Sequence, residues 1–121
     1  MARFQRLDVT EFTAAREASP APFVLDVRGA EAFAAGHVPG ARTIPVHELA
    51  ARRSELPHGK TERLLVVGDS DKRTAAAATF LTLFGFADVA VLAGGFAAWT
   101  GAVDTGPPRR PRPRGPELRI I

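Results

Sequence analysis

The chain has 121 residues, of which 45% are hydrophobic and 24% charged, with a formal net charge of +3 and no cysteine. This length and composition predict one globular domain with a sizeable core, and the lack of cysteine excludes disulfides, thiolate metal sites and cysteine chemistry. The first residues, MARFQRLDVTEF, contain no apolar segment of a signal peptide, and the longest charge-free stretches are shorter than a bilayer span. We therefore expect a cytoplasmic protein that does not contact membranes.

The positive charge is concentrated at the end of the chain. Residues 107–119 hold five arginines and one glutamate, so they carry +4 and leave a net charge of −1 for the rest of the sequence. We predict a folded domain over residues 1–104 and a Pro/Arg-rich tail with polyproline character over residues 105–121. Such a tail could bind an acidic partner or nucleic acid, and the alternative is a solvated, disordered tail.

The first half of the chain alternates between strand-like and helix-like segments. It predicts a strand over residues 4–7, then a helix that runs to about residue 18 and begins at Asp8, with Glu11 as its capping-box partner. A buried strand over residues 23–27, a helical turn over residues 31–35 and a short strand over residues 41–44 follow.

The second half continues the alternation. It predicts a helix over residues 47–56 with an i,i+4 pair between Glu48 and Arg52, a strand over residues 64–67, and an alanine-rich helix over residues 74–84. Gly85 is the expected C-terminal cap of that helix. A fifth strand over residues 89–92 leads into a last helix that carries Phe96 and Trp99. The order of elements indicates an α/β fold with a mainly parallel sheet.

The segment between the fourth strand and the alanine-rich helix is the candidate site. It consists of Gly68, Asp69, Ser70, Asp71, Lys72, Arg73 and Thr74. A strand, a short loop and a helix N-terminus direct backbone N–H groups and the helix dipole to one spot, which suits an anion. Ser70 or Asp71 is expected to cap the helix. The carboxylates of Asp69 and Asp71 would each repel a bound anion by about 1–4 kcal/mol, or one of them would fill the cradle as a built-in anion.

Three blocks of sequence together resemble a rhodanese-like, or sulfurtransferase, domain in its single-domain form. The blocks are Leu25-Asp26-Val27-Arg28 with Glu31, Phe33, Gly36-His37-Val38-Pro39-Gly40-Ala41 and Ile44-Pro45; Val66–Thr74 with Gly85-Phe86; and Val91–Trp99. The resemblance covers residues 4 to about 104. It implies a five-stranded, mainly parallel sheet flanked by helices on both faces, with an active site at the carboxyl edge of the fourth strand.

In this family a cysteine thiolate takes sulfur from a donor such as thiosulfate and passes it on as a persulfide. The motif runs cysteine, four residues, arginine, then serine or threonine, which places Gly68 at the cysteine position and identifies Arg73 and Thr74 as its last two members. The resemblance also suggests that Asp26 braces Arg73, and Asp26 and Arg28 are the expected supports of the loop. His37 is expected to be a structural, hydrogen-bonding histidine.

These residues favour a rhodanese-like domain without thiosulfate sulfurtransferase activity, with a binding or regulatory role toward an unidentified protein or small molecule. No metal or cofactor is implied. Three alternatives remain open at this point: an active member of the family, an Asp-based phosphatase-like enzyme that uses Asp69 and Asp71 with Mg²⁺, and a protein that works mainly through its tail. A thiol supplied in trans by a partner also remains open, as does the oligomeric state.

Overall fold

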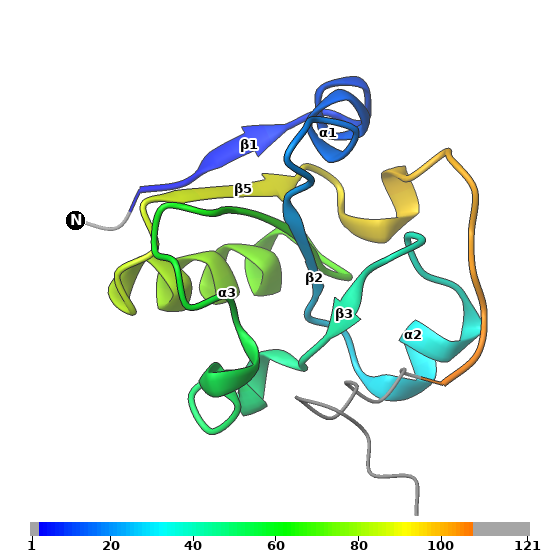
Figure 1. The fold of residues 1–121 in the computed structure, drawn as a ribbon. Helices are drawn as coiled ribbons and strands as arrows, with labels where there is room; N and C mark the ends of the chain where they lie inside the picture. Colours follow the sequence, from blue (N-terminus) through cyan, green and yellow to red (C-terminus); the bar gives the residue numbers. More distant parts are fainter. Residues whose placement is uncertain (1–2, 108–121) are drawn as a thin grey trace, which may run out of the picture.

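The computed structural model describes residues 3–107. All five strands of its sheet are parallel and follow the order β1-β5-β4-β2-β3 (Figure 1). The strands are β1 (Gln5–Leu7), β2 (Phe23–Asp26), β3 (Arg42–Thr43), β4 (Arg63–Val67) and β5 (Asp88–Leu92). The helices are α1 (Val9–Arg16), α2 (Ala30–Ala35) and α3 (Asp71–Leu83), and 3₁₀ turns cover Val46–Glu48, Arg53–Glu55 and Gly95–Ala98. The predicted five-stranded parallel sheet is confirmed.

The central strands are apolar on both sides because helices cover both faces of the sheet. One layer of buried side chains lies between the sheet and α3, and it contains Leu64, Val66 and Leu81. The other lies toward α1 and the last 3₁₀ turn, and it contains Phe12, Leu65 and Trp99. Neighbouring strand residues thus alternate between two cores, which explains the uninterrupted hydrophobic run of β4.

The start of α1 shows how local sequence sets an element boundary. Asp8 accepts a hydrogen bond from the backbone N–H of Glu11 at 2.8 Å, and its own N–H donates to the Glu11 carboxylate at 2.9 Å. This is the predicted capping box. Gly85 ends α3 with a φ of +104°, a left-handed conformation that favours glycine, so the predicted C-terminal cap is also confirmed.

The predicted helix over residues 47–56 is wrong. The structure has two separate 3₁₀ turns there, Val46–Glu48 and Arg53–Glu55, although Leu49 and Leu56 are both buried as the periodicity indicated. Arg52 holds this segment together, because its guanidinium donates to Glu48 at 3.0 Å and to Glu55 at 2.7 Å. The expected Glu48–Arg52 pair is therefore present without the α-helix.

The described end of the chain crosses over α2 (Figure 1). His37 and Asp104 form an isolated antiparallel bridge, and the N–H of Gly106 donates to the carbonyl of Ala34 at 2.9 Å. The predictions for the tail beyond Pro107 lie outside the described residues. Among residues 3–107, no helix is long and apolar enough to cross a membrane.

Candidate functional site

The candidate loop lies where β4 ends and α3 begins, at the carboxyl edge of the sheet. Buried Val67 closes the strand, and Ser70 is the N-cap of α3, with its hydroxyl oxygen accepting from the N–H of Arg73 at 3.3 Å. A serine in extended conformation at this position satisfies one of the free N–H groups of the helix start. The predicted capping role of Ser70 is confirmed.

Gly68 is buried, and Thr74 fills the space beside it. A Cβ atom added at Gly68 would overlap Oγ1 of Thr74 and would lie 3.1 Å from its Cβ. The Thr74 hydroxyl is held there because it donates to the carbonyl of Ser70 at 2.6 Å, and the residue has no exposed surface. Gly68 has no positive φ, so its backbone conformation does not require glycine. The lack of space beside Thr74 is what disfavours a larger residue at this position.

The segment after β5 closes the other side of Gly68. The N–H of Phe96 donates to the Gly68 carbonyl at 2.8 Å. Gly95 has a φ of +70°, and a Cβ on it would come within 2.6 Å of the same carbonyl. A glycine at position 95 therefore permits the close approach of the two loops. The backbone of Gly68 is fixed from both directions.

The two aspartates of the loop are paired with arginines. Asp69 lies 3.3 Å from the guanidinium of Arg73, and Asp71 lies 3.0 Å from that of Arg6 in β1. The other carboxylate oxygen of Asp71 accepts from the N–H of Gly94 at 2.9 Å. The expected repulsion of a bound anion by these aspartates took no account of their partners: each carboxylate is offset by an arginine, and Asp71 is bound to the β1–β5 side.

These contacts also bear on the phosphatase-like alternative. A Mg²⁺ site would need the oxygens of Asp69 and Asp71 to converge on one point, whereas each carboxylate is in contact with a different arginine. Within residues 3–107, no group of three or more His, Asp or Glu side chains is placed to hold a metal ion. The geometry does not favour Asp-based chemistry at this loop.

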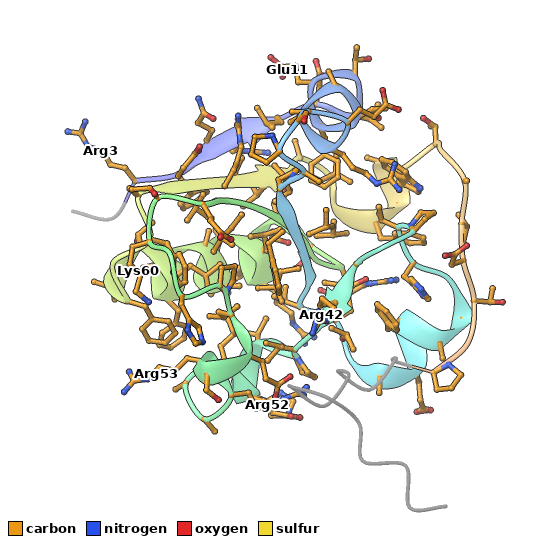
Figure 2. The ribbon with its side chains drawn as sticks, in the orientation of Figure 1. Arg3, Glu11, Arg42, Arg52, Arg53 and Lys60 are labelled. Atoms are coloured by element: carbon orange, nitrogen blue, oxygen red, sulfur yellow. The ribbon has the colours of Figure 1, made fainter. Side chains whose placement is uncertain are left out.

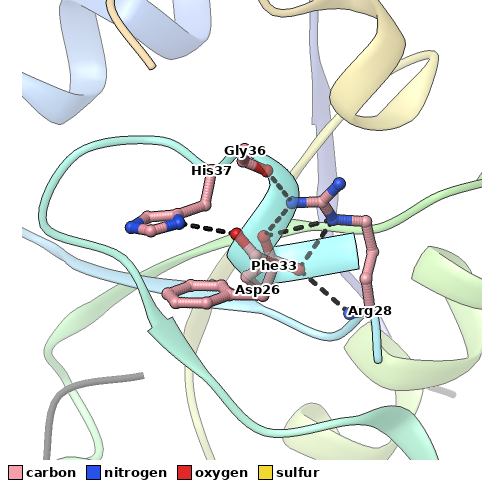
Figure 3. A network of polar contacts seen from close by, with 5 residues as sticks. All are labelled: Asp26, Arg28, Phe33, Gly36 and His37. Carbon is pink, nitrogen blue, oxygen red and sulfur yellow. Dashed lines mark hydrogen bonds and ion pairs between the residues drawn. The ribbon is translucent and has the colours of Figure 1, made fainter. Parts of the chain in front are cut away.

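The predicted supporting residues form a buried network of their own (Figure 3). Asp26 is fully buried at the end of β2 and accepts from the backbone N–H of Arg28 at 3.0 Å and from its guanidinium at 2.8 Å. Arg28 also donates to the Gly36 carbonyl at 2.7 Å and stacks 4.2 Å from the ring of Phe96.

The suggestion that Asp26 braces Arg73 is wrong, because Asp26 is already satisfied by Arg28, its neighbour two residues along the chain. Arg73 instead is exposed and pairs with Asp69, one helical turn before it. Support from Arg28 reaches the loop only indirectly, through Phe96, whose N–H binds Gly68.

His37 is structural, as expected. Its Nδ1 lies 2.7 Å from the carbonyl of Phe33, and the two rings stack with centroids 3.7 Å apart (Figure 3). Its backbone pairs with Asp104 in both directions. The histidine thus joins α2 to the end of the domain and makes no contact with the candidate loop.

A pocket of about 820 Å³ lies away from the loop, between α2, β3 and residues 103–107. Its wall includes Arg52 and Glu55. The hydrogen bond from Arg52 lowers the pKa of the Glu55 carboxyl below its ordinary value and outweighs the opposing effect of burial. None of residues 68–74 lines this pocket.

Sequence reasoning located the loop but missed the partners that fix it. These partners are Arg6 in β1 and Gly94 and Phe96 in the turn after β5. Of the two residues that bind Asp71, Arg6 lies 65 positions away in the sequence and Gly94 lies 23 positions away. The only signal for Gly94 was the double glycine after the fifth strand. Nothing in the local sequence of Arg6 indicates its pairing.

Comparison with known proteins identifies the family to which this fold belongs. Residues 8–102 match the family model described as a rhodanese-like domain. The chain is 36% identical over 101 residues to the thiosulfate sulfurtransferase GlpE of Pseudomonas putida (strain GB-1), covering 82% of this chain and 87% of the relative.

Solved structures show the same fold. A structure of the Alr3790 protein from Anabaena sp. superimposes with a TM-score of 0.74 at 32% identity and covers 82% of both chains. A rhodanese-like domain protein from Staphylococcus aureus superimposes with a TM-score of 0.75 at 23% identity, covering 84% of this chain and 98% of the other, which supports the fold alone. The chain belongs to the rhodanese-like domain family, and its sequence contains no cysteine.

Proposed function

We propose that this rhodanese-like domain is a binding or regulatory module that does not transfer sulfur from thiosulfate. The observation that carries the proposal is Gly68: no atom at that position can form a persulfide, and no cysteine exists elsewhere in the chain. The hydroxyl of Thr74 occupies the space where a side chain at residue 68 would begin. The loop is thus packed around the glycine.

The remaining loop residues support the same conclusion. Ser70 uses its hydroxyl oxygen as the helix cap, and a serine oxygen cannot carry sulfane sulfur. Asp69 and Arg73 pair with each other, so the arginine that follows the motif cysteine in the family is in contact with a carboxylate of this chain. Binding of a free anion would have to displace that pairing.

The test is a thiosulfate–cyanide assay on the purified full chain, in which the formation of thiocyanate is measured. The Pseudomonas putida relative serves as the positive control, since its name states that activity. We expect no turnover above the protein-free blank, with or without added glutathione as a thiol in trans. Turnover that is proportional to protein concentration and is lost in Arg73→Gln would refute the proposal.

Two further expectations remain predictions: the cytoplasmic location, and the domain boundary between residues 104 and 105. Limited proteolysis of the full chain tests the boundary. We expect the first stable fragment to end after Gly106, because the N–H of Gly106 still bonds to Ala34, which moves the expected boundary slightly beyond the sequence-based one.

A further inference from the structure

The outer face of α3 presents large apolar side chains to solvent. Leu83 is 71% exposed and Phe80 is 43% exposed, and exposed Ala76 lies one turn before Phe80 on the same face. The helix has no charged residue after Arg73, so no long charged side chain of α3 itself covers this face. Contiguous exposed apolar surface on a small domain marks an interaction site.

This face is rigidly mounted. The opposite side of α3 carries Ala77, Ala78 and Leu81, which are fully buried against the sheet. Phe84 continues the exposed face into the core, since its ring lies 6.2 Å from that of Phe80 and packs against the buried cluster. We call Ala76, Phe80, Leu83 and Phe84 the α3 surface. A partner would meet a helix that is already folded and packed on the sheet, which lowers the entropic cost of binding.

Basic side chains lie near both ends of the α3 surface. The guanidinium of Arg53 lies 5.5 Å from the ring centroid of Phe84, and Nζ of Lys60 lies 4.2 Å from that of Phe86, just beyond the C-terminal end of α3. Figure 2 shows Arg53 and Lys60 on the side of the molecule where α3 ends. Lys72 is exposed in the first turn. Among residues 3–107, no carboxylate lies within 4.0 Å of any of these three cations.

We propose that the α3 surface is a docking site for a protein segment, helical in the bound state, that carries an apolar stripe flanked by aspartate or glutamate. The apolar stripe would cover Phe80 and Leu83, as the apolar face of one amphipathic helix packs against the exposed apolar face of another. The flanking carboxylates would meet Arg53 and Lys60 at one end and Lys72 at the other, which fixes the orientation of the segment through charge complementarity.

The same charges disfavour a second copy of this chain as the occupant. A two-fold axis perpendicular to α3 would place Lys72 of one copy against Arg53 and Lys60 of the other. A two-fold axis along α3 would place each of these cations near its own equivalent. Both arrangements bring like charges together, which is unfavourable. The apolar residues of the α3 surface lie outside the loop of residues 68–74, and only Lys72 belongs to both. The inference therefore does not depend on whether the loop transfers sulfur.

The probes are three fluorescein-labelled synthetic peptides of about 18 residues, long enough to form a helix. Two share a leucine stripe with helical spacing, flanked by glutamate in one and by lysine in the other. The third keeps the glutamates and replaces the leucines by glutamine, so it measures the attraction of its charges to the basic side chains and the tail without the apolar contact. Fluorescence anisotropy is followed on titration with the full chain at low and high salt. We expect the leucine–glutamate peptide to bind at least about tenfold more tightly than either of the others.

Paired variants locate the binding. We expect Leu83→Ser to weaken the leucine–glutamate peptide about tenfold, whereas Val103→Ser, which removes an exposed apolar side chain elsewhere, changes affinity less than about twofold. Arg53→Gln with Lys60→Gln should weaken binding about three- to tenfold and reduce its salt dependence. The matched control is the double variant Arg3→Gln with Arg42→Gln, which also removes two positive charges, but away from the α3 surface.

The proposal is overturned if the lysine peptide binds as tightly as the glutamate peptide, or if Leu83→Ser leaves affinity unchanged. It is also overturned in favour of self-association if the wild-type chain sediments as a dimer and Leu83→Ser as a monomer. Because Leu83 is largely exposed, its replacement is expected to leave the fold intact, and a circular dichroism melt confirms this for every variant.

Discussion

The substitution Gly68→Cys is expected to destabilise the fold. The new Cβ would overlap Oγ1 of Thr74, and this hydroxyl is fully buried and bonded to the Ser70 carbonyl at 2.6 Å. If Thr74 rotates away, its buried hydroxyl and the carbonyl lose a hydrogen bond, at a cost of about 1–3 kcal/mol. If it stays, the loop is overpacked, which costs a similar ~1–3 kcal/mol. We therefore expect a loss of about 2 kcal/mol in the free energy of unfolding, or about 10 °C in Tm.

A double-mutant cycle in urea measures this coupling. Thr74→Ala removes the overlapping oxygen and leaves only the Cβ contact of 3.1 Å. On its own this variant loses the hydrogen bond to Ser70, whereas in the Gly68→Cys background it also relieves the overlap. The two substitutions should therefore cost about 1–2 kcal/mol less together than the sum of their separate costs.

Gly68→Ala is the matched control, because it adds the same Cβ without a thiol. We expect it to be destabilised nearly as much as Gly68→Cys, since the overlap is with Cβ itself. If both variants are as stable as the wild type, or if the cycle is additive, then Thr74 does not fill the space beside Gly68 and the packing argument is refuted.

Three other predictions rest on single contacts. Asp26→Ala should cost about 3–5 kcal/mol in urea unfolding, because it leaves the buried guanidinium of Arg28 without its carboxylate; a loss below 1 kcal/mol would contradict this. Asp8→Ala should cost about 1 kcal/mol through the lost capping box, and Asp8→Asn, which keeps a cap acceptor, clearly less. The pKa of Glu55 is lowered from 4.5 by Arg52, so the stabilisation is present above pH 4.5 and is lost as the pH falls through the lowered pKa. The wild type should therefore be more stable than Glu55→Gln above pH 4.5, and an equal difference at all pH values would refute the assignment.

The sheet and the capped ends of helices could be predicted because short-range patterns encode them. The run Leu64–Val67 has the length and continuity of a strand buried on both faces, and Asp8 with Glu11 contains the whole capping box within four residues. The helix predicted over residues 47–56 was wrong because the spacing of its side chains fits more than one backbone arrangement. The burial of Leu49 and Leu56 is compatible with a helix, but Arg52 reaches both glutamates from between two 3₁₀ turns, and side-chain spacing does not distinguish these arrangements.

The position of the candidate loop was predictable, while its electrostatics were not. The residues alone place two carboxylates and two cations within five positions, and the sum of their charges does not reveal their partners. Asp71 is neutralised by Arg6, 65 residues away in sequence, and this contact exists only because β1 lies next to β5 in the sheet. Likewise, the filling of the space at Gly68 depends on the rotamer of Thr74, which the hydrogen bond to Ser70 determines.

The strand order has a consequence for how the protein folds during synthesis. β1 pairs only with β5, so Gln5–Leu7 are made first and have no partner until Ala90–Leu92 leave the ribosome. Pairing between segments so distant in sequence is slow, because the chain entropy of a long loop is lost before any contact forms. We expect the β4–β5 pair and α3 to form an early nucleus and β1 to join last. A nascent chain released before residue 92 would leave an edge of β4 and the apolar layer beneath α1 uncovered.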